Sequence, residues 1–131
     1  EFANSFRSRL VFIMARHQDE WIAGTFNVRK GDALYGRYWG CSIDCDFLHF
    51  ELCYHRPIEL CIEKGWTRFE AGAQGQHKLK RGLLASPTYS LHWIAHRGLH
   101  DAVKNAVSLE NVHTEQEIIL QNEHTPFRRE Q

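Results

Sequence analysis

Alternating apolar and polar positions mark the first third of the chain. The run Leu10 to His17 is short, apolar and rich in strand-forming residues, and a polar turn separates it from a second candidate strand, Trp21 to Arg29. In this second strand the apolar residues fall mainly at even positions, the period-two pattern of a half-buried sheet. Another turn leads into a third candidate strand, Ala33 to Trp39. The pattern predicts three antiparallel strands in a meander.

A helical period replaces this alternation after an irregular stretch at residues 40–46. Residues 47–64 carry apolar side chains at roughly helical spacing, and Gly65 follows as a stop signal. Pro57 lies inside this segment, where a proline removes a backbone hydrogen bond and clashes with the preceding turn. We therefore expect either a kink or two helices that meet near Arg56.

The second half of the chain predicts two further strands and a last helix. Residues 67–71 read as a strand, and the order strand, helix, strand favours a crossover with parallel pairing. A glycine-bearing loop, residues 72–87, leads to a predicted strand at Thr88 to Ile94. A final helix is predicted from near Leu99, with a polar composition beyond Val112. The predicted fold class is α+β, with a mixed, mainly antiparallel sheet flanked by helices.

Composition and charge narrow the class of protein. The 131 residues fit one domain, which we place at residues 1–124 with a loose tail at 125–131. Sixteen basic residues balance sixteen acidic ones, so no overall field favours nucleic acid or a membrane surface. We find no apolar run long enough for a membrane span and no signal peptide, and predict a soluble cytoplasmic protein. The cysteines are predicted to be reduced thiols: Cys41, Cys45, Cys53 and Cys61.

The polar run at residues 69–81, FEAGAQGQHKLKR, is the strongest candidate for chemistry. Glycines bracket a basic cluster there, so backbone N–H groups and charge-assisted bonds could hold an anion. The run lacks the Gly-Lys-Ser/Thr ending of a P-loop and the spaced glycines of a dinucleotide fingerprint. By themselves these residues favour a solvated basic loop.

Acid and base candidates lie in and near the same run. Neighbouring cations would lower the pKa of His77 and favour its neutral, basic form. Glu70 could share a cleft with Glu51 and Glu63 and act in proton transfer. Alternatively, Glu70 could pair with a nearby Lys or Arg and order the loop, which spacing alone slightly favours.

Two other groups of residues have competing interpretations. Cys41, Cys45, His49 and Cys53 recur every four residues, but the early ones do not lie in a predicted helix, so buried thiols are favoured over a zinc site. Among the aromatic residues, most of which we expect to pack, Tyr38 and Tyr89 remain candidate proton donors.

Several motifs carry a resemblance to a known family. They are GRYWGC (36–41), LHFELCY (48–54), RFEAGAQG (68–75), HKL (77–79), PTYS (87–90), HWI (92–94) and the closing HTPFR (124–128). In this order they resemble the FemAB-like peptidoglycan biosynthesis/recognition family of bacterial proteins, of the GNAT acyl-CoA N-acyltransferase superfamily. The resemblance implies the C-terminal lobe of a GNAT-like fold, completed in longer members by an N-terminal portion. The absence of an initiator methionine agrees with that expectation.

The resemblance implies a splayed sheet at which an acyl donor meets an amine acceptor. The expected donor is acyl-CoA or, as in Fem-type transferases, aminoacyl-tRNA, and no metal is expected. Acyl-CoA-dependent members bind the donor at a basic, glycine-rich turn, whereas the corresponding residues 40–46 contain two aspartates and no basic residue. The implied site residues are catalytic Glu70, His77 and Tyr89, donor-binding Lys78, Lys80, Arg81, Gly72 and Gly75, and substrate-binding Tyr38, Glu51 and Gln74.

Three functions follow from these observations. The first is N-acyl or aminoacyl transfer to an amine of a peptidoglycan precursor or related metabolite, with tRNA as a further partner if it is the donor. The second is a non-catalytic module that binds peptidoglycan fragments or another anionic ligand through the basic loop. The third is a half-domain that self-associates, as a homodimer for example, through exposed strand edges.

Overall fold

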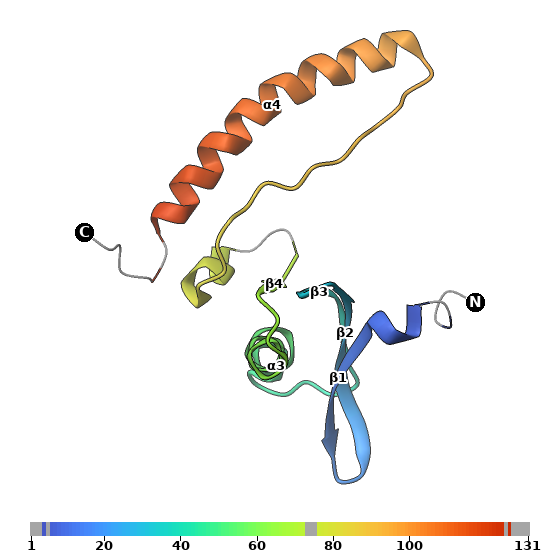
Figure 1. The fold of residues 1–131 in the computed structure, drawn as a ribbon, viewed down its shortest axis with the longest axis vertical. Helices are drawn as coiled ribbons and strands as arrows, with labels where there is room; N and C mark the ends of the chain where they lie inside the picture. Colours follow the sequence, from blue (N-terminus) through green and yellow to red (C-terminus); the bar gives the residue numbers. More distant parts are fainter. Residues whose placement is uncertain (1–3, 5, 73–75, 125, 127–131) are drawn as a thin grey trace. The chain divides into compact units, whose positions relative to one another are not determined.

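The structure, a computed structural model, describes residues 4, 6–72, 76–124 and 126. It forms two compact units, Glu1–Gln74 and Gly75–Gln131, which are treated separately below (Figure 1). The domain that we placed at residues 1–124 stays a prediction. Of the tail expected to be loose, only Pro126 lies within the described residues.

The first unit is built on a four-stranded sheet in the order β1-β2-β3-β4. A short 3₁₀ turn, η1 (Arg7–Arg9), precedes β1 (Leu10–His17), β2 (Glu20–Lys30) and β3 (Ala33–Cys41), which pair antiparallel. The β1–β2 turn, Gln18-Asp19, has positive φ at both residues, which suits the twist of a two-residue hairpin. The predicted meander is confirmed.

The helix that follows contains one wide turn. The segments α2 (Leu48–Phe50), η2 (Glu51–His55, a π-helical turn) and α3 (Arg56–Lys64) run on from one another. Pro57 is the second residue of α3, two positions after the π-helical turn, and it is buried. Because proline has no N–H to donate, a change in hydrogen-bond spacing just before it accommodates the ring without ending the helix. The predicted irregularity near Arg56 is therefore a π-helical turn.

Gly65 ends α3 in the left-handed conformation, with φ of 66°. The N–H of Gly65 bonds to the carbonyl of Ile62 at 3.2 Å, and the N–H of Trp66 bonds to the carbonyl of Cys61 at 2.8 Å. This pair of bonds is a Schellman motif, and it confirms the predicted helix stop.

The strand β4 (Arg68–Glu70) returns parallel to β3, which confirms the predicted crossover and mixed sheet. Hydrogen bonds join the beginning of β4 to Asp32, the residue before β3. The backbone N–H groups of Thr67 and Arg68 both bond to the carbonyl of Asp32, at 3.0 and 3.3 Å, and the Thr67 hydroxyl bonds to the Asp32 carboxylate. The two parallel strands are thus held together at their amino ends.

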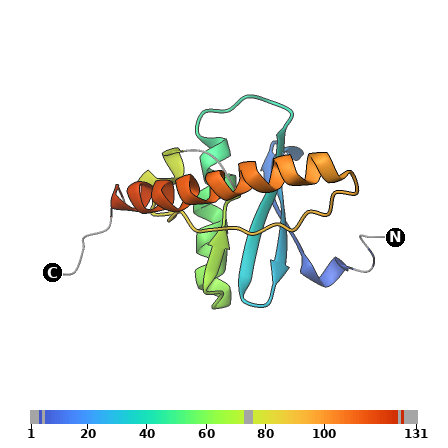
Figure 2. The same ribbon diagram turned by 90° about the horizontal axis from the view of Figure 1, so that it is seen from above.

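The core of this unit lies between the sheet and the helix (Figure 2). Leu34 of β3 is fully buried, and Leu52, Tyr54 and Cys61 are the buried helix residues of the apolar core. A polar group is also buried here: Asn27 is only 2% exposed. The Asn27 amide donates to the backbone carbonyl of Val11 at 3.2 Å and to the hydroxyl of Thr25 at 2.9 Å, so β2 is tied to β1 by a side chain as well as by the backbone ladder.

The second unit contains η3 (Gln76–Arg81, a 3₁₀ helix), an extended segment and α4 (Arg97–Glu123). The extended segment returns beside α4 in both ribbon views (Figures 1 and 2). Asn122 of α4 holds it there, since its side chain accepts from the N–H of Ala85 and donates to the carbonyl of the same residue, each at 2.8 Å. None of the helices in the described part of the chain has the length and apolarity needed to cross a membrane.

The predicted strand at Thr88 to Ile94 is wrong, since residues 83–94 have no regular secondary structure. Tyr89, Leu91 and Trp93 alternate as in a strand, yet all three are exposed. Alternation describes a strand only where a neighbouring strand supplies backbone partners, and no described strand pairs with this segment. The predicted last helix is confirmed, and it continues through the polar residues beyond Val112 to Glu123.

Candidate functional site

The parallel pairing of β3 with β4 ends after three residues. The last pair is Tyr35 with Glu70, after which β4 ends while β3 continues to Cys41. Beyond Tyr35, no strand among the described residues pairs with this edge of β3. The main-chain groups of an unpaired edge can bind an extended ligand as an added strand.

Gly36 follows the last residue of β3 that pairs with β4. A Cβ atom there would lie 3.5 Å from the backbone oxygen of Glu70, 3.9 Å from the Cα of Ala71 and 3.6 Å from the Oδ1 of Asn27. These are ordinary contact distances, so any side chain longer than a methyl group would fill the space between the strands. The absence of a side chain at Gly36 therefore leaves space beside Glu70 and Ala71.

Glu70 lies at the end of β4 with a cationic partner. Its Oε1 is 3.2 Å from the Nε of Arg68, and its side chain is 37% exposed. The sequence spacing favoured an ion pair between Glu70 and a nearby cation, and the structure shows one with Arg68. The Glu70 carboxylate is still partly exposed to solvent. The acid–base role of Glu70 stays a prediction.

Arg68 belongs to a cluster that sequence reasoning missed. Its Nη2 donates to the phenol oxygen of Tyr35 at 2.8 Å, and its guanidinium carbon lies 5.8 Å from the centre of that ring. The guanidinium carbon of Arg37 lies 5.5 Å from the centre of the same ring. Bonding to Tyr35, together with the Glu70 carboxylate, raises the pKa of Arg68. Both guanidinium groups thus contact the Tyr35 side chain, and Tyr35 pairs with Glu70 across the two strands.

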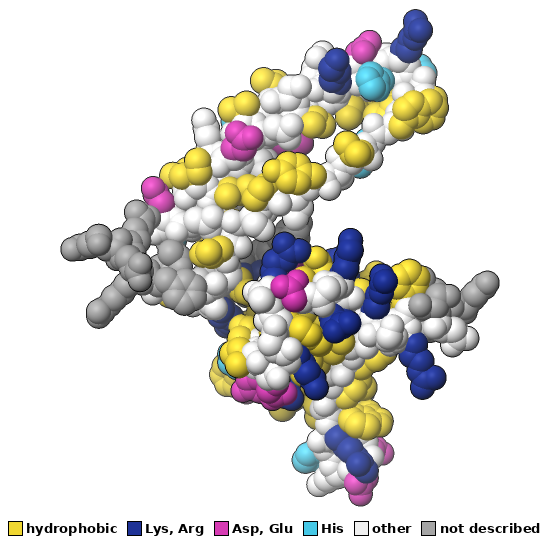
Figure 3. All heavy atoms as spheres, in the orientation of Figure 1, with side chains coloured by type: hydrophobic (Ala, Val, Ile, Leu, Met, Phe, Trp, Pro, Cys, Tyr) yellow, Lys and Arg dark blue, Asp and Glu magenta, His cyan; other side chains and the backbone are white. Residues whose placement is uncertain are grey.

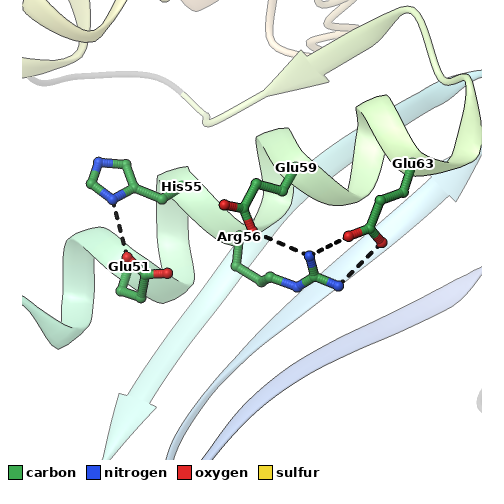
Figure 4. A network of polar contacts seen from close by, with 5 residues as sticks. All are labelled: Glu51, His55, Arg56, Glu59 and Glu63. Carbon is green, nitrogen blue, oxygen red and sulfur yellow. Dashed lines mark hydrogen bonds and ion pairs between the residues drawn. The ribbon is translucent and has the colours of Figure 1, made fainter.

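The other two carboxylates predicted near Glu70 belong to separate ion pairs on the helix (Figure 4). Glu51 accepts from or pairs with the Nδ1 of His55 at 3.1 Å. Arg56 donates to Glu63 at 2.6 and 3.2 Å and to Glu59 at 3.2 Å. This arrangement lowers the pKa of Glu63. Twelve residues of helix, about 18 Å at 1.5 Å per residue, separate Glu51 from Glu63, so the predicted common cleft is wrong for this pair.

The basic loop is described only in part. Gly72 has a φ of 77°, a conformation that favours glycine. The predicted site residues Gln74 and Gly75 lie outside the described residues, as does the side chain of His77. The basic residues of η3 are described: Lys78, Lys80 and Arg81.

Within η3, Lys78 and Arg81 are three residues apart, which brings two side chains onto one side of a 3₁₀ helix. Partial burial lowers the pKa of Lys78. Gly82, with φ of 80°, ends the helix, and the N–H of Leu83 bonds to the carbonyl of Lys78 at 3.2 Å. The donor-binding roles of these residues stay predictions.

The two candidate tyrosines are both exposed. Tyr38 is 74% exposed, and its ring centre lies 6.1 Å from that of Phe26, which lies 5.4 Å from that of Phe12. These three rings form a row across β3, β2 and β1. Tyr89 is 91% exposed in the extended segment of the second unit. Their roles as proton donor or substrate contact also stay predictions.

The cysteines are free thiols. The expected burial is wrong for Cys41 and Cys45, which are exposed in and after the end of β3, whereas Cys53 is partly buried and Cys61 is buried. Burial raises the pKa of Cys53 to about 11. His49, which alternated with the cysteines, packs among aromatic rings, with its ring centre 5.3 Å from that of Trp39 and 5.8 Å from that of Tyr54. In the ranges that the structure describes, no three His, Cys, Asp or Glu side chains are placed to hold a metal ion.

These features define an α+β protein whose mixed sheet joins an antiparallel meander to one parallel crossover strand, with a charged cluster where the parallel pairing ends. A sequence model of the FemAB-like family, described as peptidoglycan biosynthesis/recognition, matches residues 1–129. The chain therefore belongs to the FemAB-like family, and the resemblance in its motifs is confirmed. No curated protein and no solved structure matches the chain significantly. Its placement in the GNAT superfamily stays a prediction.

Proposed function

We propose that this protein transfers an acyl or aminoacyl group to an amine of a peptidoglycan precursor or a related metabolite. The observation that supports the proposal is the end of parallel pairing between β3 and β4 at Tyr35 and Glu70, which leaves Glu70 beside a part of β3 that no described strand pairs with on this edge. Membership of a peptidoglycan biosynthesis/recognition family supports the choice of acceptor.

Amide formation from a thioester or ester needs three things at one place. The acceptor amine must lose a proton, the tetrahedral oxyanion must be stabilised, and the donor must be held in reach of the amine. The edge of β3 that no described strand pairs with offers backbone groups to hold an extended donor, and Glu70 offers a carboxylate at the start of that edge. In the proposed reaction Glu70, or His77, accepts the proton of the acceptor amine, and Tyr89 is a candidate to protonate the leaving group.

The donor is the less constrained partner. Acyl-CoA and aminoacyl-tRNA both carry phosphates, which Lys78, Lys80 and Arg81 would bind, with Gly72 and Gly75 allowing the loop to approach them. The turn at residues 40–46, which leads from β3 to the helix, has two aspartates and no basic residue, so it offers no charge for a CoA pyrophosphate. This difference favours aminoacyl-tRNA as the donor. Tyr38, Glu51 and Gln74 are the proposed acceptor contacts.

The test is transfer by the full chain. The protein is incubated with a peptidoglycan precursor bearing a free amine and with either an aminoacyl-tRNA or an acyl-CoA, and mass spectrometry follows the gain of one acyl group by the acceptor. Removal of a general base by Glu70→Gln should lower kcat by about 10²-fold to 10⁴-fold. Glu59→Gln, which removes a carboxylate from the outside of α3, is the matched control and should leave kcat unchanged. Absence of transfer with both donors would refute the proposal.

A second candidate function is binding without catalysis. It is favoured by the ion pair of Glu70 with Arg68, which gives this carboxylate a structural role. A binding module would retain peptidoglycan fragments after Glu70→Gln and lose them when Lys78 and Arg81 are neutralised. Retention by both variants would exclude the module.

A further inference from the structure

The Arg37 and Arg68 side chains, here called the guanidinium pair, have binding capacity beyond their contacts within the fold. Arg68 uses one nitrogen for the Tyr35 phenol and another for Glu70. Arg37 is exposed, and its described interaction is with the face of the Tyr35 ring. A guanidinium has five N–H donors, so most donors of the pair remain available to a ligand.

The backbone register directs the cluster to a common face of the sheet. Tyr35 and Glu70 are paired across β3 and β4, and Arg68 lies two residues before Glu70, so all three side chains project from the same face. Arg37 joins them through its contact with the Tyr35 ring. Figure 3 shows Lys and Arg side chains gathered around the β3 and β4 end of the sheet. The cluster therefore lies beside the place where the pairing of the two strands ends.

The charge of Arg68 is offset within the fold, whereas that of Arg37 has no described ion-pair partner. Glu70 offsets the charge of Arg68, and Asp32 lies close enough to interact with Arg68 as well. No described carboxylate forms an ion pair with Arg37. The ring beneath it fixes the guanidinium in orientation, which lowers the entropy lost when an anion binds.

We infer that the guanidinium pair binds an oxyanion group, a carboxylate or a phosphate, of the acceptor substrate. Planar guanidinium groups match the geometry of such anions and bind them through two parallel hydrogen bonds. An anion held here would fix the acceptor next to Glu70, at the start of the free β3 edge. The inference depends on the proposed function only in assigning the bound molecule as the acceptor.

The experiment is a titration of the full chain at constant ionic strength, without an acyl donor, and binding is measured by calorimetry or NMR. Inorganic phosphate and N-acetyl-alanyl-alanine, which has one terminal carboxylate, are the two probes. Saturable binding of one of them identifies the anion. Arg37→Gln should raise Kd for that probe by at least about tenfold, the loss expected for a charge-assisted bidentate contact. Arg68→Lys should also weaken binding several-fold, because lysine keeps the charge but lacks the planar guanidinium that donates two parallel hydrogen bonds.

Arg29→Gln is the matched control. Arg29 also lies over an aromatic ring, with its guanidinium carbon 5.6 Å from the centre of Trp66, so the variant removes the same charge and the same kind of contact elsewhere in the unit. It should leave Kd within about twofold. Equal weakening by Arg29→Gln and Arg37→Gln, or no saturable binding of either probe, would overturn the inference. Since the titration needs no turnover, a protein that binds the probe but transfers nothing would refute the proposed function and leave this site intact.

Discussion

The substitution Asn27→Asp tests whether the buried amide at the centre of the sheet stabilises the first unit. The two side chains have nearly the same shape, so packing changes little. The amide donates both to Val11 and to Thr25, at 3.2 and 2.9 Å, and an ionised carboxylate can donate to neither. The same change places a negative charge against the backbone oxygen of Val11 in a position that is 2% exposed.

The expected loss can be estimated from these contacts. Two hydrogen bonds contribute about 1 kcal/mol each, and of the acceptors they leave behind Thr25 is buried and Val11 is partly buried. Burial also raises the pKa of the introduced carboxyl, and each unit of that shift removes about 1.4 kcal/mol at neutral pH. We expect the free energy of unfolding to fall by at least about 3 kcal/mol at pH 7, a large part of the roughly 5–15 kcal/mol typical of a domain.

The pH dependence has a definite sign. Because the folded-state pKa of the introduced carboxyl is raised, the folded protein binds its proton more tightly than the unfolded chain does. The difference from wild type should be smallest below about pH 4, the unfolded pKa of an aspartate, and should grow as the pH rises through the folded pKa. Stability to urea, followed by tryptophan fluorescence between pH 4 and 8, measures it.

Asn111→Asp is the control for the introduced charge. Asn111 is exposed on α4, and its replacement should change stability by less than about 0.5 kcal/mol. The reasoning fails if Asn27→Asp is as stable as Asn111→Asp at pH 7. It also fails if the deficit of Asn27→Asp does not shrink on acidification, because the buried charge would then not be its cause.

Three further predictions concern single residues. Asn122→Ala removes both bonds to Ala85, and hydrogen exchange at the Ala85 amide should accelerate about tenfold or more while exchange in the sheet is unchanged. Gly65→Ala places a Cβ at a φ of 66° and should lower the free energy of unfolding by about 1 kcal/mol in urea titrations, with Gly65→Asn retaining more stability. With a pKa of about 11, Cys53 should react with iodoacetamide at pH 8 far more slowly than exposed Cys41, as peptide mass spectrometry can follow; equal rates would contradict the burial of Cys53.

Local signals were enough to predict most of the first unit. The meander, the helix and its stop at Gly65 follow from periodicity and turn chemistry, which act over a few residues. The crossover followed from the order of elements. The wide turn before Pro57 was foreseen only as an irregularity, because proline shows that a hydrogen bond is missing but not how the chain compensates for it.

The charged cluster could not be predicted, since it depends on register. Tyr35 and Arg68 are 33 residues apart, and they meet only because β4 returns parallel with Tyr35 opposite Glu70. A signal was present in part, because Tyr35 and Arg37 share a strand at a spacing of two. The strand wrongly predicted at Thr88 to Ile94 has the same cause. Its apolar residues do alternate, but a strand also needs a neighbouring strand to pair with, and the local sequence does not show whether one is present.

The position of the candidate site follows from the way β3 and β4 are joined, since the hydrogen bonds that link their beginnings have no described counterpart beyond Glu70. Two backbone bonds and one side-chain bond join Thr67 and Arg68 to Asp32, where β3 begins. At the other end Gly36 contributes no side chain to hold the strands together, and β4 stops at Glu70. Pairing that begins at the amino ends of these strands and stops at Glu70 leaves the carboxyl-terminal part of β3 unpaired by any described strand on this edge, and carboxyl ends are where open sheets with parallel strands bind ligands. The fold thus brings the free edge of β3, the Glu70 carboxylate and the guanidinium pair to one place, and a ligand bound there would contact all three.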